Sequence, residues 1–477
     1  MIRNTYRKIV ANPAIALSCI IFLATILRLF QLDYESLWLD ELYSVVPVNP
    51  SNDLDFIINY AKTDQPPFYF LLLHYWFKIT TYTSFSARLL SAVIGILGVL
   101  VMYFLGKEFK NQFIGLTASF LTAINYFHIY YSQEVRFYGL LFLLSALSFL
   151  FFLRCYKRPI FLNFLFYILS SIALLYTQYF GLLIIFTHGI ILCYFALILQ
   201  KNRDFWLYGL VSIFLIMLAF SPWFSVIFYD LSISSYWIEQ PKPWFIFVYI
   251  YIYWGKDFLT VIILSLLALL WIIKVFKNYK SIILLDKFLV LTLLTWTILT
   301  YSIPYIKSII STPTLIPRYT LITLPALFII YAHGINILKN HKAKVYIFAL
   351  LLCASFINLF FIRYYNKIDK PQWREAAQIV IDKNPGDVKI YSNWEWWYNF
   401  YFYNSIPGLR VVGMYSSNPE AEIDYFINEV GNEEKFWVLG AEGNSGLNDL
   451  QQKFIDEKFH ILEQHNFMNS SAILYGQ

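Results

Sequence analysis

The sequence predicts a polytopic α-helical membrane protein with about eleven transmembrane helices and a small C-terminal α/β domain. Of its 477 residues, 59% are hydrophobic and 14% are charged, whereas a soluble domain has about 25% charged residues. Apolar stretches of membrane-spanning length recur up to about residue 362, and the chain then becomes more polar. The net charge of +6 does not indicate binding to nucleic acid, because the basic residues fall in short clusters between apolar runs.

The transmembrane region, residues 1–362, divides into spans by length. A helix of about 20 mostly apolar residues crosses the hydrocarbon core of a bilayer. The first stretch follows a basic N-terminus, as a signal peptide would, but it is long and no small-residue cleavage site follows, which favours an uncleaved span. The predicted spans are 11–31, 87–106, 112–131, 137–153, 160–177, 179–199, 206–229, 257–276, 288–306, 319–338 and 344–362.

The linkers between the spans predict the orientation. Linkers rich in Lys and Arg alternate with linkers that are poorer in these residues and richer in acids. Because basic linkers stay on the cytoplasmic side, we expect a cytoplasmic N-terminus and, after an odd number of spans, a tail on the opposite face of the cell membrane. The basic linkers contain Arg3, Arg7 and Lys8; Lys107 and Lys110; Arg154, Lys157 and Arg158; Lys201 and Arg203; Lys274, Lys277 and Lys280; and Lys339, Lys342 and Lys344.

Two segments outside the spans are expected on the outward face. The first outward loop, 32–86, contains "QPPFYFLLLHYWFKIT", an apolar run that is too short to span and is typical of an interfacial or re-entrant helix. The tail, 363–477, predicts helix, Pro-Gly turn and strand in "KPQWREAAQIVIDKNPGDVKIYSNWEWW", then helix, turn and strand in "NPEAEIDYFINEVGNEEKFWVLG". A further helix is expected in "GLNDLQQKFIDEKFHILEQHNF". These patterns indicate a solvated α/β domain.

Two adjacent carboxylates, Asp40 and Glu41, stand among large apolar residues in "SLWLDELYS", just after the first span. Solvated acids at a membrane surface are one interpretation. The apolar neighbours instead favour a crevice at the interface, where a partly desolvated carboxylate suits general-base chemistry. We therefore take both acids as catalytic candidates.

Further polar side chains fall on other outward junctions. Glu134 and Arg136 stand between two spans, and Arg318 opens the tenth span on the same face. An interfacial arginine can simply extend to the headgroups, or it can bind a phosphate through two nitrogens. The middles of the spans hold almost no ionisable residues, whereas transporters place them there, so the pattern favours interfacial chemistry. Additional substrate-binding candidates are Glu134, Gln65, Tyr69, Tyr179 and His74, the last being a residue type that more often packs or hydrogen-bonds than catalyses.

An ordered set of motifs resembles the GT-C glycosyltransferases, and in particular the bacterial branch with protein O-mannosyltransferases and lipid A aminoarabinose transferases. No single motif is specific, but together they cover most of the chain in the family's order. They are "WLDELYS", "DQPPFYFLLLHYWFKI", "YYSQEVRFYGLLFLLSA", "YTQYFGLL", "IPRYTLITLPAL" and "KPQWREAAQIV". The family often has His or Lys before the double proline, where this chain has Gln65.

The resemblance implies a polyprenyl-phosphate-linked sugar as donor and an acceptor on the non-cytoplasmic face, with inversion at the anomeric carbon. Asp40 matches the family's catalytic acidic position, and Glu41 is its adjacent partner. The leaving group is a lipid phosphate, so cationic side chains must stabilise its growing charge, and Arg136 and Arg318 are the candidates. Binding of the donor phosphate and catalysis are thus expected from different loops.

Several alternatives stay open at the level of sequence. The acceptor is a lipid, a protein or a polysaccharide, and the sugar is not specified. No metal site is predicted, and a divalent cation is compatible with the acidic pair without being implied. From other functional classes, a flippase or transporter of a lipid-linked sugar and a non-catalytic subunit of a polysaccharide assembly system are the competing interpretations.

Overall fold

A computed structural model describes residues 12–232, 238–278, 284–383, 388–403, 405, 409–414, 422–441 and 447–477. By its internal contacts the chain forms two units. The helical unit comprises Met1–Gln31, Asn52–Thr80 and Ala87–Lys367, and the sheet unit comprises Leu32–Ser51, Thr81–Ser86 and Ile368–Gln477. The basic residues Arg3, Arg7, Lys8 and Lys280 and the expected Pro-Gly turn at Pro385 and Gly386 lie outside the described residues.

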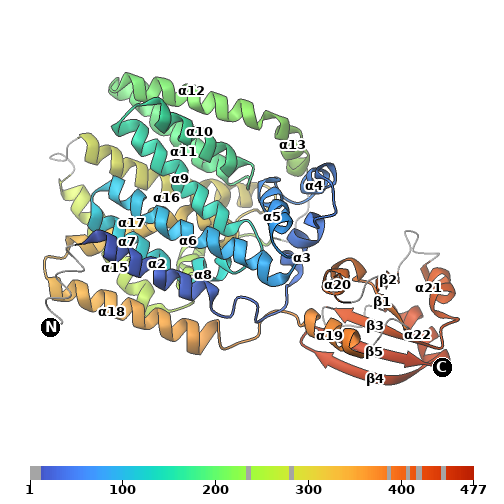
Figure 1. Ribbon diagram of the computed structural model, residues 1–477. Coiled ribbons are helices and arrows are strands. Elements are labelled where there is room, and N and C mark those ends of the chain that lie inside the picture. The colour runs from blue at the N-terminus through green and yellow to red at the C-terminus, as the bar shows by residue number, and fades with distance from the viewer. Residues whose placement is uncertain are drawn as a thin grey trace. The chain divides into compact units, whose positions relative to one another are not determined.

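The helical unit is a bundle of mostly long, apolar helices (Figure 1). A short 3₁₀ segment, η5 (Pro317–Thr323), precedes its penultimate helix. The helices are α2 (Pro13–Leu29), α4 (Leu54–Ala61), α5 (Phe68–Ile79), most of α6 (Ser84–Phe109), α7 (Gln112–Ile124), α8 (Tyr126–Ser132), α9 (Tyr138–Lys157), α10 (Phe161–Leu175), α11 (Gly181–Tyr194), α12 (Arg203–Phe220), α13 (Phe224–Ser232), α14 (Phe245–Tyr253), α15 (Phe258–Asn278), α16 (Leu284–Ile310), α17 (Leu324–Ile337) and α18 (His341–Ile357).

Hydropathy predicted the membrane helices well. Among the described residues, eight helical segments are long and apolar enough to cross a membrane, and three shorter apolar helices, α2, α7 and α10, fall on other predicted spans. The polytopic helical fold is therefore confirmed, while the number of eleven spans stays a prediction. The apolar run after the double proline forms α5. The nine-residue helix α14 was not predicted, because it is shorter than a span.

The span predicted over 112–131 is interrupted at Asn125, between α7 and α8. The Asn125 side chain caps α8 by accepting from the His128 backbone N–H (2.9 Å) and donates to the Tyr253 carbonyl (2.8 Å). The buried guanidinium of Arg28 donates to the carbonyls of Thr122 (3.0 Å) and Ala123 (3.2 Å), which the break deprives of helical partners. Side chains thus satisfy the backbone where the helix stops, as an apolar surrounding requires.

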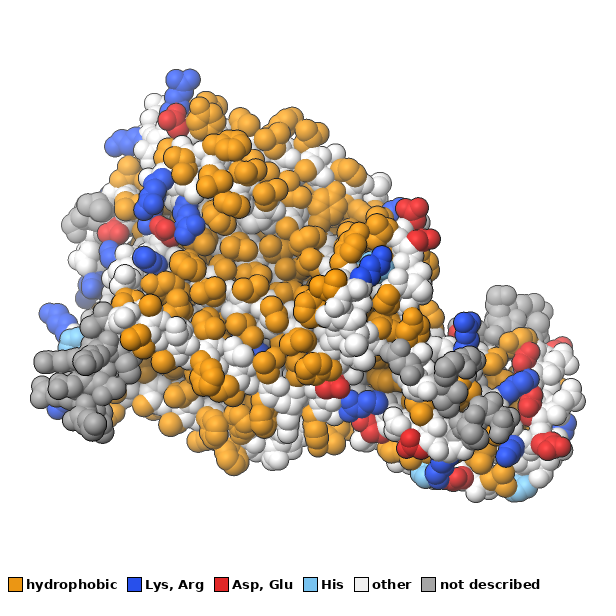
Figure 2. Space-filling model, in the orientation of Figure 1, with side chains coloured by type: hydrophobic (Ala, Val, Ile, Leu, Met, Phe, Trp, Pro, Cys, Tyr) orange, Lys and Arg blue, Asp and Glu red, His pale blue; other side chains and the backbone are white. Residues whose placement is uncertain are grey.

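Hydrophobic side chains cover most of the visible face of the helical unit, with Lys, Arg, Asp and Glu gathered toward its margins (Figure 2). Large apolar residues such as Phe161, Leu197 and Phe247 are more than three-quarters exposed. An apolar surface of this extent is unfavourable in water and is expected of helices in lipid. The surface therefore agrees with a multi-pass membrane protein.

The sheet unit contains a five-stranded sheet in the order β2-β1-β3-β5-β4. The strand β1 pairs in parallel with β2 and β3, and β5 pairs antiparallel with β3 and β4 (Figure 1). The elements of the tail are α19 (Trp373–Lys383), β1 (Lys389–Ser392), α20 (Glu395–Phe402), β2 (Val411–Gly413), α21 (Glu422–Val430), β3 (Lys435–Ala441), α22 (Asp449–Lys458), β4 (His460–Phe467) and β5 (Ser470–Gly476).

The central strand β3 is buried along nearly its whole length because helices cover both faces of the sheet. Phe426 of α21 and Ile455 of α22 join the core on one face, and Trp373 begins the buried side of α19, which contacts β3 and β5. The helix predicted over "GLNDLQQKFIDEKFHILEQHNF" ends at Lys458, and His460–Phe467 is the edge strand β4 instead. The alternation of exposed and partly exposed residues along β4 is the two-residue period of a strand.

Candidate active site

Asp40 and Glu41 occupy the first turn of a short helix, α3 (Leu39–Val45), within the sheet unit. Acids are favoured there by the positive end of the helix dipole. The Glu41 side chain is fully buried, and its Oε2 accepts from the Trp38 backbone N–H (3.3 Å) and from Lys370 Nζ (3.0 Å). Asp40 is only partly buried. The two adjacent acids therefore have different surroundings, and Glu41 is held in a buried ion pair.

The chain on the N-terminal side of α3 is bound to the tail within the same unit. Arg374 donates to the carbonyls of Asp33 (2.9 Å) and Tyr34 (2.7 Å). The Glu35 carboxylate accepts from the Asp369 backbone N–H (2.6 Å), and the Tyr401 hydroxyl bridges backbone atoms of Leu37. These bonds tie the tail to residues 33–37, which directly precede "WLDELYS" and lie more than 300 positions away in sequence.

Tyr82 belongs to the same unit and lies near the end of α3. Its hydroxyl donates to the Val45 carbonyl (3.3 Å), and its ring packs edge-on against Phe400 of α20. Burial raises the pKa of the Tyr82 hydroxyl, so this group stays protonated and remains a donor. The C-terminal end of α3 is thereby also attached to the tail, through Tyr82.

In the helical unit, Gln65 immediately precedes the double proline that starts α5. Proline is tolerated at the start of a helix because no backbone donor is needed there. Gln65 therefore lies just before the N-terminus of α5. Two other candidates lie further along α5: the Tyr69 hydroxyl is 2.7 Å from Ser91 Oγ, and His74 is fully buried. Tyr69 and His74 are thus packed inside the helical unit.

Glu134 and Arg136 lie on the turn between α8 and α9, and both are buried. The neighbouring Gln133 anchors this turn by donating to the carbonyls of Arg28 (3.0 Å) and Phe30 (2.9 Å). Arg136 Nη1 forms an ion pair with Asp64 Oδ2 at 3.1 Å. The residue next to Gln65 is therefore paired with the predicted phosphate-binding arginine.

Arg318 lies on η5, with its guanidinium 5.8 Å from the centre of the Tyr138 ring. The Arg136 guanidinium is 5.4 Å from the ring of the adjacent Phe137. Phe137 in turn stacks on Tyr319, the residue after Arg318, with ring centres 6.4 Å apart. One group of aromatic rings therefore connects the two candidate arginines.

A cavity of about 430 Å³ opens in the helical unit beside these residues. Gln65, Tyr179 and Tyr319 line it, together with the ion-paired Asp64. The Tyr179 hydroxyl accepts from Trp223 Nε1 (3.2 Å). Both polar and apolar residues line the cavity. The polar ones are Thr63, Asp64, Gln65, Gln178, Tyr179, Lys307, Thr312 and Thr314, and the apolar ones include Leu182, Leu183, Ile227, Ile238, Ile303 and Pro304.

The basic residue Lys307, near the end of α16, also lines this cavity. It was not a candidate from the sequence. Its Nζ donates to the Thr312 carbonyl (3.0 Å). Within the described chain no carboxylate pairs with it, since the acid lining the cavity, Asp64, is paired with Arg136. A half-buried cation without a counter-ion makes the cavity attractive to an anion.

The structure thus gathers some of the predicted residues and separates others. Gln65 and Tyr179 line the cavity, Arg136 reaches its wall through Asp64, and Arg318 adjoins Tyr319. Tyr69 and His74 are not among the residues that line it, and Asp40 and Glu41 belong to the sheet unit. One signal could have identified Lys307: it follows a predicted span at an outward end, where the positive-inside bias disfavours lysine.

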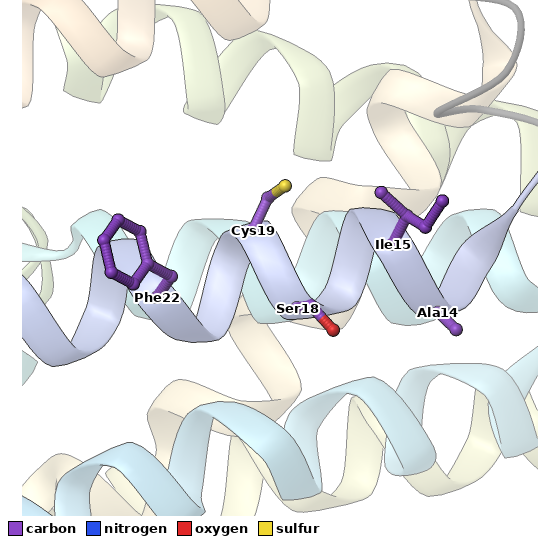
Figure 3. Close-up of a pocket in the computed structure, with 5 residues that line it drawn as sticks. All are labelled: Ala14, Ile15, Ser18, Cys19 and Phe22. Carbon is purple, nitrogen blue, oxygen red and sulfur yellow. The ribbon is translucent and has the colours of Figure 1, made fainter.

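A second hollow, of about 420 Å³, lies along α2 and has none of these features. All of its lining residues come from one helix, and none is charged. Figure 3 shows Cys19 and Ile15 on one side of α2 and Ser18 and Ala14 on the other, with Phe22 a turn further on. We interpret this hollow as ordinary membrane-facing surface.

Comparison with known families gives a match over part of the chain. Residues 64–226 match the family described as dolichyl-phosphate-mannose-protein mannosyltransferase. The matched segment begins at the Asp64 of the cavity wall and includes Arg136 and Tyr179. No curated protein matches the chain.

Comparison with solved structures covers nearly the whole chain. ArnT from Cupriavidus metallidurans, in the apo state and bound to undecaprenyl phosphate, is 11% identical with a TM-score of 0.62, over 96% of this chain and 97% of that one. The oligosaccharyltransferase of Archaeoglobus fulgidus is 13% identical with a TM-score of 0.55, over 88% of this chain and 67% of that one. At these identities the likeness shows a shared fold, and that fold is the one the sequence resemblance predicted.

Proposed function

We propose that this chain, a membrane protein with the GT-C glycosyltransferase fold, transfers a sugar from a polyprenyl-phosphate donor to an acceptor hydroxyl on the non-cytoplasmic face. The fold and the mannosyltransferase-family match support a glycosyltransferase that uses a lipid-linked donor. Inversion at the anomeric carbon, the outward orientation and the individual residue roles are parts of this proposal.

The observation that carries the proposal is the cavity, whose lining is both polar and apolar. A polyprenyl-phosphate sugar has an anionic, hydrogen-bonding head and a hydrocarbon chain. The lining includes Lys307, Gln65 and Gln178, and also the apolar Leu183 and Ile303. This mixed lining suits such a lipid, because the cavity holds groups that match the head and groups that match the chain.

The cationic groups support departure of the lipid phosphate. When the bond between the anomeric carbon and the phosphate oxygen breaks, the oxygen takes the electron pair and the phosphate gains negative charge. We assign Lys307, Arg136 and Arg318 to stabilising that charge. These cationic groups are in position before the reaction begins, and they stabilise the negative charge as it develops. The polyprenyl phosphate then leaves as the second product.

The acceptor hydroxyl needs a base, and we assign Asp40 to that role. As the hydroxyl oxygen bonds to the anomeric carbon, its proton passes to the Asp40 carboxylate. Glu41 is less suited, because its carboxylate is fully buried and is already bonded to the Lys370 ammonium at 3.0 Å. We assign Glu41 to holding α3 in place.

Mass spectrometry of envelope lipids and glycans tests the function in cells. The comparison is between cells that lack the protein and cells that express the wild type, Asp40→Asn or the control Asp55→Asn, an exposed acid of the same outward loop. We expect one glycan species to require the wild type or Asp55→Asn and to be absent with Asp40→Asn. Unchanged glycans in all four strains contradict the transferase.

Assays of the purified protein separate the transferase from the two alternatives. A flippase moves the lipid-linked sugar without forming product, so purified protein in vesicles would translocate donor and release no polyprenyl phosphate. A non-catalytic subunit would need other proteins for any product. Release of polyprenyl phosphate by the purified chain alone excludes both.

A further inference from the structure

A third cavity, of about 200 Å³, lies at the other end of α16 from Lys307. Asp286 lines it, and 21 residues separate Asp286 from Lys307 in the same helix, which corresponds to about 32 Å at 1.5 Å per residue. This separation is close to the thickness of a hydrocarbon core, about 30 Å. The length of α16 therefore suits a place for this third cavity at the opposite membrane surface, and the site does not depend on the proposed reaction.

The ends of several helices build this cavity. It lies where α6 and α17 end, beside the last turns of α15 and the first turns of α16. Its deeper wall is apolar, with Trp271 and Leu293 buried. The Trp271 ring lies 5.8 Å from that of His333, which also lines the cavity. Tryptophan beside polar groups at a helix end is typical of headgroup depth.

The polar rim of the cavity has an excess of positive charge. Lys110 Nζ lies 3.2 Å and 3.3 Å from the two oxygens of Asp286, so these two charges offset one another. Lys274 also lines the cavity, and in the described part of the chain no carboxylate pairs with it. Both lysines and Asp286 line this cavity together with His333.

A third lysine adjoins the rim. Lys344 of α18 donates from Nζ to the Asn336 carbonyl (3.3 Å), and Asn336 lines the cavity. Its ammonium also lies 4.6 Å from the centre of the Phe113 ring, which holds the side chain toward the bundle. Two lysines thus line the cavity, and a third, from another helix, adjoins it through Asn336.

We infer that this cavity binds the headgroup phosphate of an anionic phospholipid. Lys274 and Lys344 supply the uncompensated charge, Asn336 adds an amide, and the apolar wall beside Trp271 accepts the start of an acyl chain. Lysines near an anionic membrane surface are attracted to its headgroups, and the partial enclosure between helices adds contacts that a flat surface lacks. The combination of lysines with an apolar wall selects a lipid over a free phosphate ion.

Lipid binding to the purified full chain tests this inference. Native mass spectrometry and thermal melting, followed by tryptophan fluorescence, compare added phosphatidylglycerol, phosphatidylcholine and inorganic phosphate. We expect phosphatidylglycerol to bind and to raise the melting temperature more than either other addition. Equal effects of the two lipids, or full competition by inorganic phosphate at millimolar concentration, would overturn the inference.

Charge variants locate the binding at this cavity. Lys274→Glu should weaken phosphatidylglycerol binding on the order of tenfold, while Lys277→Glu, one turn further along the same helix and outside the cavity lining, should change it little. Asp286→Asn should strengthen binding, because it releases Lys110 from its counter-ion. Equal effects of Lys274→Glu and Lys277→Glu, or weaker binding in Asp286→Asn, contradict the site. All three changes replace charged side chains near the ends of α15 and α16, so folding is expected to persist, and melting in phosphatidylcholine controls for it.

Discussion

Lys370 Nζ lies 3.0 Å from Glu41 Oε2, and both side chains are almost completely buried within the sheet unit. The ion pair joins the first outward loop to the tail, across 329 positions of sequence. The pair also distinguishes the two adjacent acids, because Glu41 is bonded to Lys370 whereas Asp40 is partly exposed.

Removing one member of this pair should destabilise the sheet unit. Loss of one partner leaves a buried charge uncompensated, which costs about 3–5 kcal/mol. We expect Glu41→Gln and Lys370→Met each to increase cleavage of the tail in limited proteolysis of the purified chain. The double variant should lose less stability than the sum of the losses in the two single variants.

A surface ion pair supplies the control for this prediction. Lys389 and Glu433 are 2.7 Å apart, but the lysine side chain is 53% exposed, and exposed pairs contribute little. Lys389→Met should leave the cleavage rate nearly unchanged. If Glu41→Gln behaved like Lys389→Met, the buried pair would not anchor α3.

Lys307 should contribute to binding of the donor phosphate. Loss of a charge-assisted contact costs about 1.5–3 kcal/mol, which is roughly a tenfold or greater rise in Kd. We expect Lys307→Gln to weaken binding of undecaprenyl phosphate by this amount and to leave binding of the uncharged alcohol undecaprenol unchanged. The exposed Lys256 provides the control variant Lys256→Gln. Equal losses for the phosphate and the alcohol would assign Lys307 to packing.

Arg318 should act on the donor and not on the acceptor. Arg318→Ala removes a guanidinium beside the cavity, so the donor concentration needed for half-maximal transfer should rise while that of the acceptor stays the same. Arg318→Lys should restore part of the loss, because it keeps the charge without the two-pronged geometry. A change in the acceptor value alone would place Arg318 in the acceptor site.

The expected topology places the tail outside the cell. Cysteine labelling of intact cells checks it, in a background without Cys19, Cys155, Cys193 and Cys353. A cysteine at the exposed Lys453 should react with a membrane-impermeant reagent, and one at Asn340 should react only after the membrane is permeabilised. Labelling of both positions, or of Asn340 alone, in intact cells would reverse or reject this orientation.

The helices followed from the sequence because a long apolar segment has few other stable conformations in lipid. The break at Asn125 did not follow, since it depends on Arg28 and Tyr253, which are distant in sequence. The strand β4 was assigned to a helix because its partner β5 lies beyond the segment considered, and pairing outweighs local preference.

Site residues that belong to a sequence motif could be predicted. Pairs of residues that are distant in sequence and meet only in the folded chain could not. Gln65 and Tyr179 were found from outward motifs and do line one cavity. The pairing of Glu41 with Lys370 and of Arg136 with Asp64 required the structure. Lys307 belongs to no motif. In the sequence only its place at the predicted outward end of a span marks it, and the cavity shows what it lines.

Transfer by purified protein in vesicles tests the central claim most directly, with released polyprenyl phosphate measured alongside donor binding. Asp40→Asn keeps the shape of the side chain but cannot accept the proton, and a general base contributes about 10²–10⁴-fold in rate. We predict that wild type and Asp55→Asn release polyprenyl phosphate, that Asp40→Asn is slower by about that factor with unchanged donor binding, and that Glu41→Gln is affected less. Near-normal release by Asp40→Asn would contradict the assignment of Asp40 as the base, and absence of release by the wild type with every donor tested would contradict the transferase.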